Sequence, residues 1–134
     1  MAAKKALDSS ALLVLLRAET GGNEVRKLLE TAASRDGVLH MTEVCFAEVK
    51  SEVCKSSGTE SWNRIAKELP ALPIEFHLAD RQLSELAGRF GSQSGVSIAD
   101  AFAAALAKSL KADLVSAKDY GVIEKEITVI HVSK

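Results

Sequence analysis

The feature that most constrains this fold is a stretch of small and apolar residues, Val96 to Ala107, which has almost no polar face when it is drawn as a helix. A helix that is apolar nearly all round must be buried between neighbouring elements. The stretch therefore predicts a central helix within a layered core. Its one acid, Asp100, falls in the first turn, where it fits a capping box with Ser97 or a metal ligand at the edge of the core.

Short apolar runs alternate with helical patterns along the rest of the chain. This alternation predicts an α/β fold with three layers, α/β/α, around a central parallel sheet of four to five strands. A chain of 134 residues is long enough for one domain with a sizeable core, so we expect a single domain over residues 1–134. The expected strands are 5–7, 38–41, 74–77, 112–116 and 128–132, and the expected helices before the central one are 11–16, 24–34, 42–56, 59–65 and 78–89.

Four acidic residues, Asp8, Glu48, Asp100 and Asp119, lie near the predicted carboxyl ends of strands. In open parallel sheets, ligands bind beyond these ends. Asp8, Asp100 and Asp119 each also fit an ordinary helix cap or turn residue. Glu48 has no capping role, because it lies inside a predicted helix beside a buried stripe. Their shared placement favours one site.

Several carboxylates in one pocket repel each other unless a cation is shared. Oxygen ligands without His or Cys favour Mg²⁺ or Mn²⁺ over zinc. Such ions promote hydrolysis of phosphodiester bonds, so this reaction fits the four acids. Cysteine and histidine, the other common metal ligands, are predicted to be structural in this chain. The reduced core thiols are Cys45 and Cys54. The histidines, which are predicted to lie too far apart to share a site, are His40, His77 and His131.

Three segments together resemble the PIN domain, especially the VapC toxin ribonucleases. They are Ala6-Leu7-Asp8-Ser9-Ser10-Ala11-Leu12-Leu13, Phe46-Ala47-Glu48-Val49, and Ser97 to Ala107. Each segment alone is a weak signal, but the three in this order span essentially the whole chain.

The resemblance implies an endoribonuclease that depends on Mg²⁺ or Mn²⁺, with a sheet of strand order 3-2-1-4-5. It also implies a homodimer, and a small antitoxin protein that inhibits the enzyme by covering its active site. By the same match Asp8, Glu48 and Asp100 are the metal ligands, and Ser9 or Ser10 supplies hydrogen bonds behind them.

The sequence departs from the family at the end of the fourth strand. Similar proteins usually carry Thr-x-Asp there, whereas this chain has Ser116-Ala117-Lys118, and Asp119 follows one residue late. If the turn is shortened, Asp119 is the fourth catalytic acid and metal ligand, which is our expectation; otherwise Lys118 places a cation there. Cys45 also stands where similar sequences often have Asn.

Charge and hydropathy limit the other classes of function. The net charge of −1 does not attract a polyanion, so RNA would have to bind a local patch. Candidates are Lys50, Lys55, Arg64 and Lys67, with Arg17 as a weaker one. The longest apolar run is too short to cross a bilayer, and no signal-peptide pattern is present, so we expect a cytoplasmic protein without membrane contact.

Two other functions remain open. One is a catalytically weak or inactive PIN-fold module that binds RNA or a protein partner. Trp62 is expected to be a core or dimer-interface anchor rather than a platform for base stacking. The other is a phospho-receiver, which ranks last because His77-Leu78 follows the third strand where a receiver needs an acid.

Overall fold

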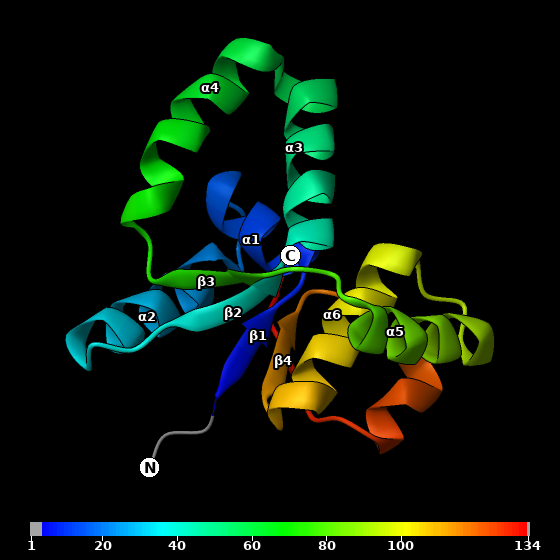
Figure 1. The fold of residues 1–134 in the computed structure, drawn as a ribbon. Helices are drawn as coiled ribbons and strands as arrows, with labels where there is room; N and C mark the ends of the chain where they lie inside the picture. The colour runs from blue at the N-terminus through cyan, green and yellow to red at the C-terminus, as the bar shows by residue number, and fades with distance from the viewer. Residues whose placement is uncertain (1–3, 134) are drawn as a thin grey trace.

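The computed structural model describes residues 4–133, which form a five-stranded parallel sheet with the order β3-β2-β1-β4-β5 (Figure 1). The predicted parallel sheet and its 3-2-1-4-5 order are therefore confirmed. The carboxyl ends of the central strand β1 and its neighbour β4 are followed by Asp8 and by the loop that begins at Ala117. The strands are β1 (Lys5–Leu7), β2 (Leu39–Thr42), β3 (Ile74–His77), β4 (Asp113–Ser116) and β5 (Val129–His131).

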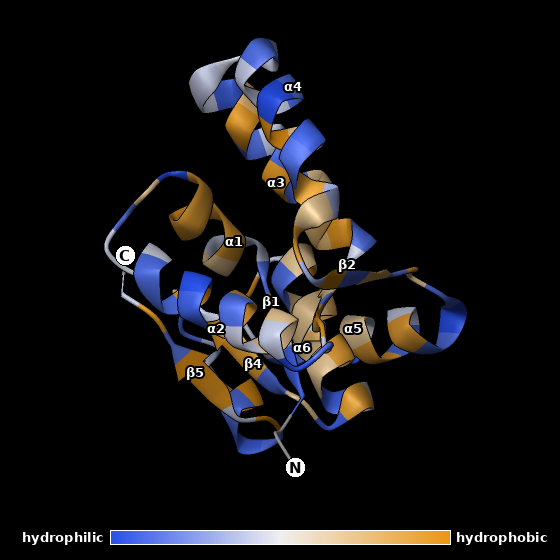
Figure 2. Cartoon of the chain, turned by 90° about the vertical axis from the view of Figure 1, so that its left-hand side faces the viewer, coloured by the Kyte–Doolittle hydropathy of each residue, from blue (hydrophilic) through white to orange (hydrophobic). Residues whose placement is uncertain are grey.

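Helices cover both faces of the sheet and complete the three layers. One core cluster joins Leu7 and Val115 of the sheet to residues of α1 and α2, and the other joins Ala6 and Leu114 to α6 and α5. The outward face of α2 is largely hydrophilic in Figure 2. The helices are α1 (Ser9–Leu16), α2 (Gly22–Ser34), α3 (Glu43–Ser57), α4 (Thr59–Glu68), α5 (Arg81–Gln93) and α6 (Ile98–Leu110), with short 3-10 helices η1 (Leu69–Ala71) and η2 (Gly121–Lys125).

Helix α6 is the buried central helix that the apolar stretch predicts. Its residues Ala103 to Ala107 are all at most 3% exposed. The Oγ of Ser97 accepts a hydrogen bond from the backbone N of Asp100 at 3.1 Å and caps the helix. The cap thus uses the backbone of Asp100 and leaves its carboxylate available for other contacts.

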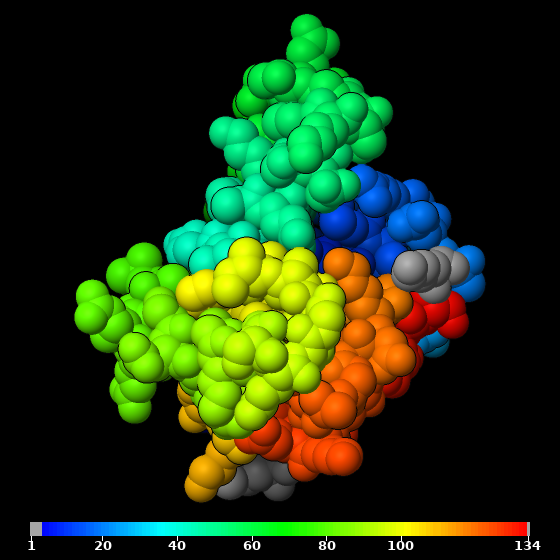
Figure 3. All heavy atoms as spheres, turned by 90° about the vertical axis from the view of Figure 1, so that its right-hand side faces the viewer, coloured from blue at the N-terminus to red at the C-terminus, as the bar shows by residue number. Residues whose placement is uncertain are grey.

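Helices α3 and α4 form a hairpin that projects from the body of the domain (Figures 1 and 3). Gly58 joins them with φ of 87°, a conformation that favours glycine. Trp62 is buried within this hairpin, and its ring packs edge-on against Phe46 at 5.5 Å between centroids. The aromatic pair fixes α4 against α3, which confirms a core role for Trp62.

Several helices differ from their predicted limits, by two residues or more at the start of α1 and the end of α4. Helix α2 begins at Gly22 rather than after Asn23. Helix α5 begins at Arg81, because the carboxylate of Asp80 accepts a hydrogen bond from Leu83 N at 2.8 Å and caps it there. The same helix continues through Gly91 to Gln93, where a loop is predicted, since the fully buried Phe90 anchors its last turns in the core. Within residues 4–133 no helix combines the length and apolar character that a membrane span requires.

Candidate active site

Asp8 is a fully buried carboxylate at the point where β1 ends and α1 begins. Its Oδ1 accepts hydrogen bonds from Ala11 N at 2.9 Å and Ser10 Oγ at 2.6 Å. Its Oδ2 accepts from Ser116 Oγ at 2.5 Å and Tyr120 OH at 2.7 Å. A carboxylate offers about four acceptor positions, so these four donors hold Asp8 in one fixed orientation.

The serines around Asp8 also attach the loop after β4 to the start of α1. Ser10 Oγ accepts from Ala117 N at 2.9 Å, and Ser116 Oγ accepts from Lys118 N at 2.8 Å. Ser9 points elsewhere and its Oγ donates to Cys45 O at 3.3 Å. Of the two serines expected behind the acids, Ser9 and Ser10, only Ser10 contacts Asp8. Ser116 is an unpredicted partner of the same carboxylate.

Tyr120 is a second unpredicted partner of Asp8. Its side chain is fully buried, and burial raises the pKa of its hydroxyl, with the charges of Asp8 and Asp100 adding to the effect. The hydroxyl therefore remains a neutral donor to Asp8. It is the only tyrosine in the chain, and its position in a predicted turn gave no sign of a buried role.

Replacing Tyr120 with Phe should destabilise the domain while keeping the ring in place. The change removes a hydrogen bond to a buried charged group, which typically contributes about 1.5–3 kcal/mol. Urea denaturation should show a loss of this size. Ser92→Ala, which removes an exposed hydroxyl bonded to Arg89 O, should change the free energy of unfolding by no more than about 0.5 kcal/mol. Equal stability of Tyr120→Phe and the wild type would contradict a structural bond between Tyr120 and Asp8.

Glu48 and Asp100 each keep one buried carboxylate oxygen without a hydrogen-bond partner, Oε1 and Oδ1 respectively, within the described chain. Asp100 is only 4% exposed, and burial of an unpaired carboxylate oxygen costs free energy. Such oxygens are the positions that a cation would satisfy. The donor set therefore fits a hard divalent ion at Glu48 and Asp100, whereas the oxygens of Asp8 are already engaged.

A cation from the chain itself lies beside these acids. Lys118 Nζ is 3.3 Å from Asp100 Oδ2. Burial alone would lower the pKa of Lys118, but the charge and hydrogen bond of Asp100, together with the charges of Glu48 and Asp8, raise it. Lys118 is thus a stable ammonium that interacts with the charges of Asp100, Glu48 and Asp8.

The structure does not bring Asp119 to this group. Its Oδ1 accepts a hydrogen bond from Gly121 N at 3.0 Å, and this bond, with interactions from Glu124 and His131, lowers the pKa of Asp119. The physical reason is the turn itself: Lys118 N bonds to Ser116 Oγ, so the loop directs Lys118 toward the acids and Asp119 toward η2 and β5.

An open cleft of about 440 Å³ lies beside the acids, between α1, α3 and the loop after β4. The charged residues that line it are Glu19, Glu48, Glu52, Arg17 and Lys118. The cleft gives a ligand access to Glu48 from outside, and Arg17 provides a positive charge farther along it. Because three acids and two bases line the cleft, an anionic ligand would need a bound cation to offset the acids.

Two further expectations concern the thiols and imidazoles. Cys45 and Cys54 are both free, and burial raises the pKa of Cys45 to about 11, so Cys45 is an inert thiol.

The expectation that the histidines do not converge is wrong for two of them. His40 and His77 lie on the neighbouring strands β2 and β3, and His40 Nδ1 is 2.9 Å from His77 Nε2.

The chain matches the PIN domain over residues 5–126. The chain therefore belongs to the PIN domain family, which confirms the resemblance seen in its three sequence segments. No curated protein sequence matches it.

Solved structures with VapC chains share the fold over nearly the whole length. VapBC from Salmonella typhimurium bound to DNA has a TM-score of 0.73 at 16% identity, covering 97% of this chain and 98% of that one. VapBC2 from Rickettsia felis, bound to a DNA fragment from their promoter, has a TM-score of 0.72 at 13% identity, covering 96% of this chain and 98% of that one. Mycobacterium tuberculosis VapC20, a Sarcin-Ricin loop cleaving toxin, has a TM-score of 0.70 at 15% identity, covering 91% of this chain and 94% of that one.

Proposed function

We propose that this chain is a divalent-metal-dependent endoribonuclease and the toxin of a toxin–antitoxin pair. The observation that carries the proposal is the pair of unpartnered buried oxygens, Glu48 Oε1 and Asp100 Oδ1, beside an open cleft. In this proposal Glu48 and Asp100 hold Mg²⁺ or Mn²⁺, and Asp8 is the third carboxylate of the site. Membership of the PIN domain family supports nuclease activity, and the similar toxin VapC20 supports RNA as the substrate.

The bound ion would polarise a phosphodiester and favour attack by water. The chain's own residues set the geometry. Asp8 is fixed by four donors, and its bonds through Ser10 and Ser116 hold the β4 loop against α1. Arg17 and Lys118 line the cleft and provide positive charge for the RNA backbone in a chain whose net charge is −1.

One observation favours a second candidate function, a PIN-fold module that binds RNA or a protein without cutting. The Lys118 ammonium already neutralises Asp100, and it would repel a divalent ion. If the ion pair persists under physiological conditions, the site holds its internal cation in place of a metal.

Cleavage of RNA distinguishes the two functions. We expect the purified chain to cut total cellular RNA in Mn²⁺, to stop in EDTA, and to resume when Mn²⁺ is restored in excess. Glu48→Gln, which removes the charge but keeps the shape, should cut far more slowly under the same conditions. Retention of RNA on a gel without cleavage would support the binding module. If the chain neither cuts nor retains RNA, both the endoribonuclease and the RNA-binding module are contradicted.

The partners follow from the same proposal. We infer a homodimer and a small antitoxin protein that covers the cleft, acting in the cytoplasm. The VapBC assemblies with the same fold support an antitoxin partner. Sedimentation of the chain alone tests the homodimer. Sedimentation with the product of the neighbouring reading frame tests the antitoxin partner.

A further inference from the structure

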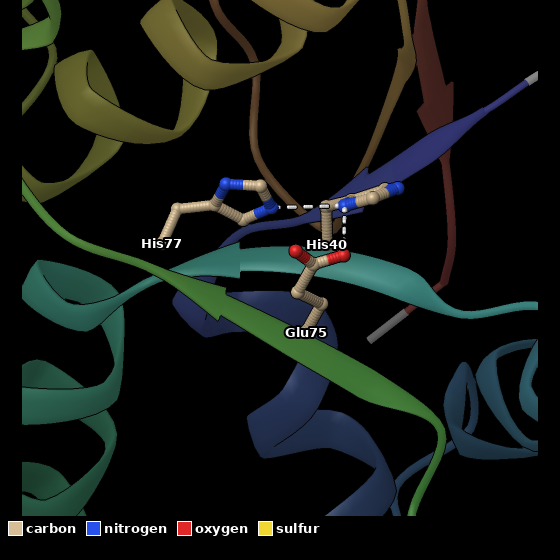
Figure 4. A group of neighbouring side chains, drawn as sticks. All are labelled: His40, Glu75 and His77. Atoms are coloured by element: carbon tan, nitrogen blue, oxygen red, sulfur yellow. Dashed lines mark hydrogen bonds and ion pairs between the residues drawn. The ribbon is translucent and has the colours of Figure 1, made fainter.

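We propose a second metal site, for Zn²⁺ or a similar transition-metal ion, formed by His40, Glu75 and His77 on strands β2 and β3 (Figure 4). The proposal is independent of the acidic cleft. It rests on one imidazole from β2 and an imidazole and a carboxylate from β3, each of which offers a ligand atom within 4.8 Å of the others.

The sheet register explains why these three side chains meet. His40 pairs with Glu75, and Thr42 pairs with His77. Alternate residues of a strand face the same side, so His77 lies on the face that carries Glu75 and His40. His77 borders a cavity that is also lined by Leu83 of α5 and Leu106 of α6. The three ligands therefore lie on the α5/α6 face of the sheet, next to its β3 edge.

The distances are close to those of a zinc site. His40 Nδ1 lies 2.9 Å from His77 Nε2 and 3.7 Å from Glu75 Oε2. Zinc bonds of about 2.0–2.1 Å in a tetrahedron place neighbouring ligand atoms about 3.3 Å apart. To bind zinc, the His40–His77 separation must widen by about 0.4 Å and the His40–Glu75 separation must shorten by about 0.4 Å. Glu75, whose side chain is 58% exposed, is free enough to make its part of this adjustment.

The protonation state of the imidazoles suits metal binding. At 2.9 Å, one ring nitrogen must accept while the other donates, so at least one ring presents a lone pair. Burial lowers the pKa of His40, and the charges of His77 and Lys4 lower it further against the opposing effect of Glu75. A neutral imidazole is the form that binds a metal.

The surroundings leave room for a fourth ligand. His77 borders a cavity of about 340 Å³ between the start of α5 and the end of α6, which Asp80 and Ser109 also line. Two imidazoles with one carboxylate prefer zinc-like ions, whereas the all-oxygen set of the cleft prefers Mg²⁺ or Mn²⁺. The two sites are therefore distinguishable by the ion that each one takes.

Titration of the untagged full-length chain with Zn²⁺ tests the proposal, with Co²⁺ as a spectroscopic probe. We expect one ion with the visible absorption of tetrahedral Co²⁺, whatever further ion the oxygen ligands of the cleft take up. We also expect a higher melting temperature in Zn²⁺, because binding stabilises the folded state. Separate substitutions His40→Ala, His77→Ala and Glu75→Gln should each weaken binding at least about tenfold, the lower end of what even outer partners of a metal site contribute.

Two controls separate this site from others. His131→Ala removes the remaining histidine, which pairs with Glu124 beside β5 at the opposite edge of the sheet, and Asp100→Asn removes an acid of the cleft. Both should keep the tetrahedral Co²⁺ absorption of the wild type. Because Glu75 is exposed, Glu75→Gln tests the site even if a histidine variant fails to fold. A tetrahedral Co²⁺ absorption that depends on His131 or Asp100, or one that the three substitutions leave unchanged, would overturn the proposal. The absence of this absorption at one equivalent of Co²⁺ would also overturn it.

Discussion

Asp100→Asn is expected to reduce RNA cleavage in Mn²⁺ by about 10²–10³-fold, the size of effect seen when one preorganised electrostatic contact to a transition state is removed. The physical reason is the loss of charge at Asp100 Oδ1, one of the two buried carboxylate oxygens without a hydrogen-bond partner that are proposed to bind the ion. The fold should be preserved. Asn has nearly the same shape as Asp, and the Lys118 side chain, which is 41% exposed, can turn to solvent when its charged partner is lost.

Asp119→Asn is the matched control for this substitution. It removes a carboxylate one residue after Lys118, but one that bonds to Gly121 N rather than facing the acids. We expect cleavage close to that of the wild type. A loss as large as that of Asp100→Asn would mean that the turn rearranges and that Asp119 joins the metal site, as the family resemblance first suggested. Activity of Asp100→Asn equal to that of the wild type would contradict the proposed site.

Lys118→Met is expected to strengthen Mn²⁺ binding roughly tenfold. The ammonium is 3.3 Å from Asp100 Oδ2 and would repel any divalent ion beside it. Even at the dielectric constant of water, a doubly charged ion and an ammonium about 5 Å apart repel each other by about 1.7 kcal/mol. Isothermal titration of Mn²⁺ into both proteins measures the difference.

Lys118→Arg keeps the charge and should bind Mn²⁺ about as weakly as the wild type. Comparing the two variants separates charge from side-chain volume. Equal affinities for Lys118→Met and the wild type would show that Lys118 does not compete for the site. The second candidate function, binding without cutting, would then lose the observation that favours it.

Local chemistry explains which parts of this molecule could be predicted. Asp8 caps α1 and Ser97 caps α6 because each is a short polar side chain directly before a helix, and both positions can be recognised in the sequence. The strand pattern likewise predicts the parallel sheet. The placement of Glu48 follows from its helix, since one face of α3 carries the buried Cys45 and Val49.

The missed features depend on contacts between distant segments. Ser116 and Tyr120 reach Asp8 across 108 and 112 residues of chain, and nothing near them in sequence marks them as its partners. The contact between His40 and His77 depends on the register of β2 against β3, which strand patterns alone do not specify. The choice between Lys118 and Asp119 depends on one turn, whose direction is set by the bond from Lys118 N to Ser116 Oγ.

An anomalous-scattering map from crystals soaked in Mn²⁺ tests the central claim most directly, because it locates the ion without reference to activity. We predict a single strong peak within bonding distance of Glu48 Oε1 and Asp100 Oδ1, with the Lys118 ammonium moved away from Asp100. A map without a peak between these two carboxylates, with Lys118 still paired to Asp100 at high Mn²⁺, would contradict the account.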